Sequence, residues 1–406
     1  MAIGLDSFPQ MFPIKGVRLA TACAGVKYKN HPDLTLIEVP IGATCTGVFT
    51  KNAFCAAPVT ICKQHLRGAD TRYLLINSGN ANAGLGQSGI DAAIQCCDAV
   101  AAHSGTQRAQ VLPFSTGVIG EQLPAGKVVS TVPELLGNLS DSAWEYAARA
   151  IMTTDTRPKG FSENIVIDGC PVTVTGISKG AGMIKPDMAT MLAFIATDAK
   201  IESSTLNSML LKAANKSFNR ITIDGDTSTN DACMLIASGQ TNLSLISDVN
   251  SSNAKQFQNL LDRACEHLAV EIIRDGEGAT KLVEVVVEGA QDQSEALGVG
   301  YTVAESPLVK TAIFASDPNW GRILAAVGRS GISNLDINGI SIYLDQVCIV
   351  ENGGRAESYR EELGAAVMAK EAFTILIRLG RGEHIEKLWT TDLSYDYVRI
   401  NAEYRT

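Results

Sequence analysis

The sequence predicts an α+β fold built as layers of helices and sheets. Short runs of β-branched residues surround Asp-Gly and Asn-Gly pairs, which is typical of β-hairpins, and longer segments place apolar residues on one helical face. Strands and helices do not alternate regularly along the chain, which argues against a doubly wound parallel sheet. A chain of 406 residues can bury a large core, so we expect two or three closely packed lobes.

Two helix starts are predicted in the first part of the chain. Ser88 with Asp91, and Ser142 with Glu145, have the spacing of a capping box, and each pair opens an alanine-rich segment. A third helix is predicted over 253–273, where one face is apolar. The residues of that face are Phe257, Leu261, Ala264, Leu268 and Ile272.

Four segments predict strands. In chain order, "VLPFSTGVIG" (111–120) is an apolar strand that ends in a Ser-Thr-Gly sequence, and "ENIVIDGCPVTVTG" (163–176) predicts a hairpin around its Asp-Gly pair. "KLVEVVVEG" (281–289) is a further strand. "LDINGISIYL" (335–344) repeats the hairpin pattern around Asn-Gly.

Composition excludes several classes of function. The net charge is −9 and the basic residues are scattered, which argues against a nucleic-acid partner. No apolar stretch reaches the roughly 18 residues of a membrane span, and no secretory signal is visible at the start. The ten cysteines form no C-x-x-C pair and lie among apolar residues, which predicts a reducing cytoplasm without structural disulfides. The five histidines lack metal-site spacing, so we expect no metal.

Common catalytic and ligand-binding motifs are absent from the sequence. The glycine-rich segments "GISKGAGM" and "GRILAAVGRSG" fit neither nucleotide-binding pattern and are better explained as tight turns. "DGDTSTND" (224–231) begins like a calcium loop, but its sixth position is Thr229 instead of glycine. No G-x-S-x-G occurs and no histidine accompanies a nucleophile motif, so an acyl-transfer enzyme would need another base.

Thr190 could provide both a nucleophile and a base without a histidine. It stands where the glycine-bearing loop of "KGAGMIKPDMATMLAFIATDA" (179–199) enters an apolar run. Cleavage of the chain between Ala189 and Thr190 would create an α-amino group with a pKa of about 7.7–8.0, which could activate the Thr190 hydroxyl. Judged by spacing alone, a packing residue at the start of a buried strand is the more common explanation of such a threonine.

A possible oxyanion hole lies in the 111–120 strand. Thr116 followed by Gly117 can aim a hydroxyl and a backbone N–H at one point, although a simple turn is the alternative.

Six stretches together resemble the ornithine acetyltransferase family of arginine biosynthesis, also called the glutamate N-acetyltransferase family. They occur in one order over nearly the whole chain: "NSGNANAGLG" (77–86), "STGVIG" (115–120), "KGAGMIKPDMATMLAFIATDA" (179–199), "TIDGDTSTND" (222–231), "DPNWGRI" (317–323) and "INAEYRT" (400–406).

This resemblance implies self-cleavage between Ala189 and Thr190 into chains 1–189 and 190–406, which share one packed core and assemble as a heterotetramer with two copies of each. It implies a helix–sheet–sheet–helix sandwich similar to the N-terminal nucleophile hydrolases, with a second, smaller α/β lobe. Thr190 is then the nucleophile, and Thr116 with Gly117 forms the oxyanion hole. Substrate contacts carry over to Thr153, Lys179, Thr190, Glu277, Asn401 and Thr406.

The activity implied is ping-pong transfer of an acetyl group from N²-acetyl-L-ornithine to L-glutamate through an acetyl-threonine, without a metal or organic cofactor. Acetyl-CoA would be a further donor if this member is bifunctional. An aminopeptidase or amidase on a related self-cleaving scaffold is the nearer alternative. A non-catalytic metabolite-binding protein with an intact chain is the more distant one.

Overall fold

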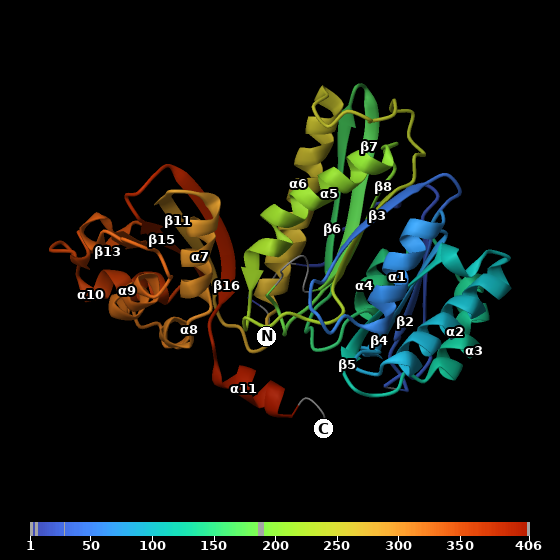
Figure 1. Cartoon of the computed structure of the whole chain (residues 1–406), viewed down its shortest axis with the longest axis horizontal. Coiled ribbons are helices and arrows are strands. Elements are labelled where there is room, and N and C mark those ends of the chain that lie inside the picture. Colours follow the sequence, from blue (N-terminus) through green and yellow to red (C-terminus); the bar gives the residue numbers. More distant parts are fainter. Residues whose placement is uncertain (1–2, 5–6, 28, 186–190, 404–406) are drawn as a thin grey trace.

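A computed structural model describes residues 3–4, 7–27, 29–185 and 191–403. The first two thirds of the chain form a layered body, and most of the last third forms a separate lobe beside it (Figure 1). Among the helices of the described residues, none combines the length and the apolar character that a membrane crossing requires.

One sheet of the body contains four strands in the order β1-β2-β4-β5. β4 and β5 run parallel, and the other neighbours are antiparallel. Alanines, cysteines and valines of α2 and α3 bury the outer face of this sheet. The bounds are β1 Arg18–Ala22, β2 Leu34–Glu38, β4 Tyr73–Asn80, β5 Val111–Val118, α2 Gln87–Ser104 and α3 Ala125–Gly137.

The other sheet of the body contains five strands in the order β3-β10-β8-β7-β6. Its outer face packs on α5 and α6, and the predicted apolar face of α6 is fully buried there. The bounds are β3 Thr44–Phe49, β6 Lys159–Ile167, β7 Cys170–Lys179, β8 Leu192–Thr197, β10 Ala232–Ala237, α5 Ser203–Lys216 and α6 Ser252–Arg274.

A shared apolar core joins the inner faces of the two sheets. Phe114 of β5 and Phe194 of β8 meet edge to face, with ring centroids 5.1 Å apart. Trp144 of α4 (Trp144–Ala150) is fully buried in the same core, and α1 (Ala57–Gly68) contributes Cys62. The predicted layered helix–sheet–sheet–helix order is therefore confirmed.

The C-terminal lobe has its own core around a sheet in the order β14-β13-β12-β15-β11-β16-β9. α11 leaves the lobe and extends toward the layered body (Figure 1). This confirms the expected smaller second lobe. The bounds are β9 Ile221–Thr222, β11 Leu282–Ala290, α7 Gln293–Ala304, α8 Pro307–Phe314, α9 Trp320–Gly328, β12 Ser341–Leu344, β13 Val347–Glu351, β14 Gly354–Arg355, α10 Glu361–Met368, β15 Ala372–Arg378, β16 His384–Thr391 and α11 Tyr395–Ala402.

The first predicted hairpin is confirmed and the second is wrong. β6 and β7 pair antiparallel around Asp168 and Gly169, whose φ values of 50° and 73° suit a two-residue turn. Asn338 and Gly339 instead belong to a short 3₁₀ helix that precedes β12. The turn between β12 and β13 contains Asp345 at φ 48°. The Asn-Gly pair therefore precedes a strand and does not connect two paired strands.

Both capping boxes are wrong, although helices begin close to them. α2 starts at Gln87 with Gly86 as N-cap, so Ser88 already lies inside the helix. α4 starts one residue later than its box predicts, with Ala143 as N-cap. Neither helix start has a side-chain cap, because glycine and alanine occupy the two N-cap positions and neither has a side-chain acceptor.

Candidate active site

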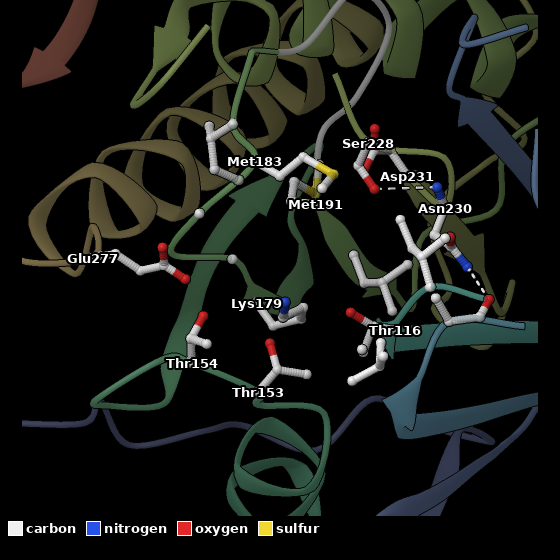
Figure 2. Close-up of a pocket in the computed structure, with 18 of the residues that line it drawn as sticks. Thr116, Thr153, Thr154, Lys179, Met183, Met191, Ser228, Asn230, Asp231 and Glu277 are labelled. Carbon is white, nitrogen blue, oxygen red and sulfur yellow. Dashed lines mark hydrogen bonds between the residues drawn. The ribbon is translucent and has the colours of Figure 1, made fainter. Parts of the chain in front are cut away.

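A cavity of about 280 Å³ lies at the end of β5 and β7, where the two sheets of the body meet the segment that follows α6. It brings together six residues that the sequence singled out, although they are far apart in the chain. Glu277 and Thr116 lie on opposite sides of the view in Figure 2, with Lys179 and Thr153 between them. The six are Thr116, Gly117, Thr153, Lys179, Glu277 and Asn401.

Three predicted site residues, Ala189, Thr190 and Thr406, lie outside the described residues. Met191, which follows Thr190 directly in the sequence, is buried and lines the cavity. Its carbonyl accepts the backbone N–H of Ala232 at 2.9 Å, which anchors the beginning of β8 to β10.

The end of β5 is fixed by its contact with β4. Gly117 has φ 135°, and a Cβ atom there would lie 2.5 Å from Asn80 N and closer still to the carbonyl carbon of Gly79. Only glycine fits this position without displacing β4. The Asn230 amide donates to Ser115 O at 2.9 Å and to Ala81 O at 2.6 Å, so it ties the residue before Thr116 to the segment that follows β4.

Lys179 is the last residue of β7, and its side chain is only 10% exposed. Its ammonium group lies 3.8 Å from the Asp155 carboxylate. The next residue, Gly180, donates its backbone N–H to the same carboxylate at 2.7 Å. The cavity therefore contains a buried cation whose position depends on one neighbouring acid.

Asp155 is a buried acid that the sequence analysis did not identify. Burial alone would raise its pKa, but Lys159 and Lys179 outweigh this effect and hold the pKa of the Asp155 carboxyl below its usual range. Burial lowers the pKa of Lys159, and its two carboxylate partners, Asp155 and Asp275, more than reverse that shift. Asp155 and Lys159 are therefore both charged inside the protein.

Glu277 follows α6 and brings a second charge to the cavity. It is 8% exposed, and its Oε2 accepts the side-chain amide of Asn401 at 2.8 Å. Its backbone N–H donates to Ala181 O at 2.7 Å. A Cβ atom at Gly182 would lie 2.5 Å from the Glu277 carboxyl carbon, so a glycine is required to let this carboxylate reach the cavity.

Asp231 is a further acid in the cavity wall to which the sequence analysis assigned no role. It is 3% exposed, and in the described part of the chain its Oδ2 has no hydrogen-bond partner. Burial raises the pKa of the Asp231 carboxyl well above its usual value, although a hydrogen bond from Ser228 and the charge of Lys179 oppose the shift. A polar run directly before a buried strand, as in "TSTND", was the sequence signal that could have identified it.

A second cavity of the same volume lies against the first. The two share Gly117, Val118, Thr153 and Thr154 as a common wall. Lys27 and His31 line the second cavity but not the first. Within the described residues, no group of three or more His, Cys, Asp or Glu side chains could hold a metal ion.

This arrangement can bind a small zwitterion and stabilise the negative charge that develops on the oxygen of an acyl group under attack. Lys179 supplies a cation for a carboxylate, and Glu277 supplies an anion for an ammonium group. A hydroxyl and a glycine backbone, at Thr116 and Gly117, are the donor types of an oxyanion hole.

Comparison with known proteins points to one family. The model of the ArgJ family matches residues 18–406. The arginine biosynthesis bifunctional protein ArgJ of Pseudomonas fluorescens is 53% identical over 406 residues, which is the full length of both chains. The protein of the same name from Methylococcus capsulatus is 55% identical over 397 residues, covering 98% of this chain and 97% of its own.

Two solved structures are also similar. The arginine biosynthesis bifunctional protein from Bacillus halodurans is 41% identical, with a TM-score of 0.49, and covers 51% of this chain and 96% of its own. Ornithine acetyltransferase of Mycobacterium tuberculosis, solved in complex with ornithine, is 33% identical with a TM-score of 0.38. It covers 44% of this chain and 94% of its own.

Proposed function

This chain belongs to the ArgJ family, and from that premise we propose that it transfers the acetyl group of N²-acetyl-L-ornithine to L-glutamate in arginine biosynthesis. The observation that carries the proposal is the cavity itself. Thr116, Lys179 and Glu277 come from three separate parts of the chain, and Figure 2 shows Lys179 between the other two. The acetyl group, α-carboxylate and side-chain ammonium of acetylornithine need partners of these three kinds.

Thr190 is proposed as the nucleophile, released by cleavage after Ala189. Its hydroxyl attacks the acetyl carbonyl while its α-amino group accepts the hydroxyl proton. Ornithine then leaves with that proton on its nitrogen, and an acetyl ester remains on Thr190. Glutamate attacks the ester through its amino group, forms N-acetylglutamate and returns a proton to the threonine oxygen. The burial of Met191 in the cavity wall supports this assignment, because Thr190 is its direct neighbour in the chain.

The Thr116 hydroxyl and the Gly117 N–H are proposed to stabilise the oxyanion of both tetrahedral intermediates. The close contact that fixes the end of β5 supports this role, because donors that are already held in place need no reorganisation during the reaction. No residue of this pair is consumed in either half-reaction.

Substrate binding is proposed to involve the remaining site residues. Lys179 and the Thr153 region hold the α-carboxylate that both substrates share, and Glu277 pairs with the ornithine ammonium. Asn401 fixes Glu277 through its 2.8 Å hydrogen bond and closes the cavity from α11. Thr406 is retained as a proposed contact on the basis of the motif alone.

The two products of cleavage, 1–189 and 190–406, are proposed to remain together as one folded unit. The five-stranded sheet supports this, because β8 and β10 follow the cut and lie between β3 and β7, which precede it. We also propose a heterotetramer with two copies of each chain, a cytoplasmic location, no cofactor, and acetyl-CoA as an additional acetyl donor.

Intact mass spectrometry followed by a coupled transfer assay tests the proposal. The purified protein should give two masses that correspond to a cut before Thr190. Acetylornithine should turn over repeatedly when glutamate is present, and no more than one equivalent per active site should be consumed when glutamate is absent. Repeated turnover without glutamate would indicate an amidase instead, and an uncut, inactive chain would contradict the proposal.

A further inference from the structure

Three charged side chains form a cluster with no solvent exposure behind the cavity. Lys159 Nζ lies 2.6 Å from an oxygen of Asp155 and 2.6 Å from an oxygen of Asp275. The side chains of all three are 0% exposed. The cluster carries a net charge of −1, and Lys179 at 3.8 Å from Asp155 brings the sum to zero.

The two carboxylates also organise the backbone around the cavity. Asp155 accepts the N–H of Thr153 at 3.0 Å through one oxygen and that of Gly180 at 2.7 Å through the other. Asp275 accepts the N–H of Thr156 at 3.0 Å and also binds its hydroxyl. The cluster therefore ties the loop after α4 to the end of β7 and to the end of α6.

Stability alone does not explain this cluster. Removing ions from water is costly, and well-packed apolar residues often replace a buried ion group with no loss of stability. What the ions provide is a fixed geometry, because a carboxylate that accepts two backbone amides and two ammonium groups has only one arrangement that satisfies all of them.

We propose that Asp155 is a positioning residue for the carboxylate subsite. It holds the Lys179 ammonium and the Thr153 backbone where the substrate carboxylate arrives, and it does not touch the substrate itself. This inference rests on the proposed function and extends it by naming the group that orders the subsite. Lys159 and Asp275 keep Asp155 in place from behind.

Asp155→Asn provides the first test. It is isosteric and keeps an acceptor, but it cannot pair with two ammonium groups. Misplacement of a binding group by about 1 Å can cost as much as 10²-fold in activity, so we expect KM for acetylornithine and glutamate to rise roughly 10- to 100-fold, with a smaller change in kcat. The matched control is Asp198→Asn, another buried aspartate that accepts a backbone N–H, from Thr173 at 2.9 Å, and does not line the cavity. Its KM should stay at the wild-type value.

A double-mutant cycle separates positioning from general damage. In the Lys179→Met background, Asp155→Asn should raise KM by no more than about threefold, since the ammonium that Asp155 orients is gone. The double variant also restores a neutral cluster, so if Asp155→Asn alone does not fold, a KM of the double variant more than about threefold above that of Lys179→Met still overturns the inference. Equal fold-changes in both backgrounds would overturn the inference.

A direct binding measurement tests the positioning role of Asp155 without depending on turnover. Calorimetric titration with L-ornithine should give a Kd for Asp155→Asn at least tenfold above that of the wild type and of Asp198→Asn. If the wild type binds ornithine but transfers no acetyl group, the proposed function fails while the positioning role is still measured. An unchanged Kd in a folded Asp155→Asn protein would refute the positioning role.

Discussion

Gly117→Ala adds a single methyl group where the backbones of β5 and β4 are in contact. The new Cβ would lie 2.5 Å from Asn80 N and closer to the Gly79 carbonyl carbon, and these are backbone atoms that cannot rotate away. The residue would also have to adopt φ 135°, a conformation that L-amino acids rarely occupy. β5 must therefore move away from β4, and Thr116 must move with it.

The expected cost has two parts. Overpacking a tight contact costs about 1–3 kcal/mol, and holding a non-glycine residue in such a conformation costs about 1–3 kcal/mol. The sum is roughly 2–6 kcal/mol of unfolding free energy. Gly120→Ala is the matched control, because Gly120 also has a positive φ of 82° but no atom within 4 Å of its added Cβ. That variant should lose only about 1–2 kcal/mol, and the difference isolates the clash.

Both variants should be measured by thermal unfolding and by acetyl transfer. Gly117→Ala should melt at a lower temperature than Gly120→Ala and should lose about 10²-fold or more in kcat, since the proposed oxyanion donors are displaced. Gly120→Ala should retain most of its activity. If Gly117→Ala had the same melting temperature as Gly120→Ala and kept its kcat, the end of β5 would tolerate the added methyl group. The proposal of a rigid oxyanion hole would then be wrong.

Three further predictions follow from the site and its surroundings. Thr190→Ala should remain a single full-length chain by mass spectrometry and transfer no acetyl group, because one hydroxyl is proposed for both reactions. Thr116→Ala, assayed on its processed fraction, should lose about 10²–10³ in kcat with little change in KM, and a wild-type kcat would remove Thr116 from the oxyanion hole. Burial lowers the pKa of Lys310 to about 8, against opposing charges that include Asp392, whereas the unfolded chain keeps this proton to about 10.5. The unfolded state therefore binds more protons in this window, so stability should rise between about pH 8 and 10.5, and denaturation of Lys310→Met should lack that rise.

The fold was predictable where local and tertiary preferences agree. The Asp168-Gly169 turn and the apolar face of 253–273 each need only their own residues to define them, and both are confirmed. The Asn338-Gly339 turn failed because Asp336 accepts the Asn338 N–H and caps a short 3₁₀ helix there, and the Ser88 cap failed because the helix begins earlier, at Gln87. Alternative starts compete within a few residues, and a short window of sequence does not select between them.

The candidate site was predictable where a sequence motif indicates a type of catalytic or binding residue. The motifs selected Thr116, Lys179 and Glu277, and the structure places all three in one cavity. Asp155 was missed because its importance lies in burial and in a partner distant along the chain, Gly180, and Asp231 was missed because its importance lies in burial; spacing reveals neither. Ala189, Thr190 and Thr406 stay predictions.

The strand order of the five-stranded sheet has a consequence for reversibility. Before the proposed cut, the chain that supplies β8 and β10 is joined to the chain that supplies β7, so refolding from denaturant is a first-order process. After the cut, the same sheet can re-form only when two separate polypeptides meet, and recovery should depend on protein concentration. At low concentration the separated polypeptides would rarely meet again, so the unfolding rate, and not an unfolding equilibrium, would set the lifetime of the folded, processed molecule. The uncut Thr190→Ala chain would be the form that returns from denaturant at high dilution.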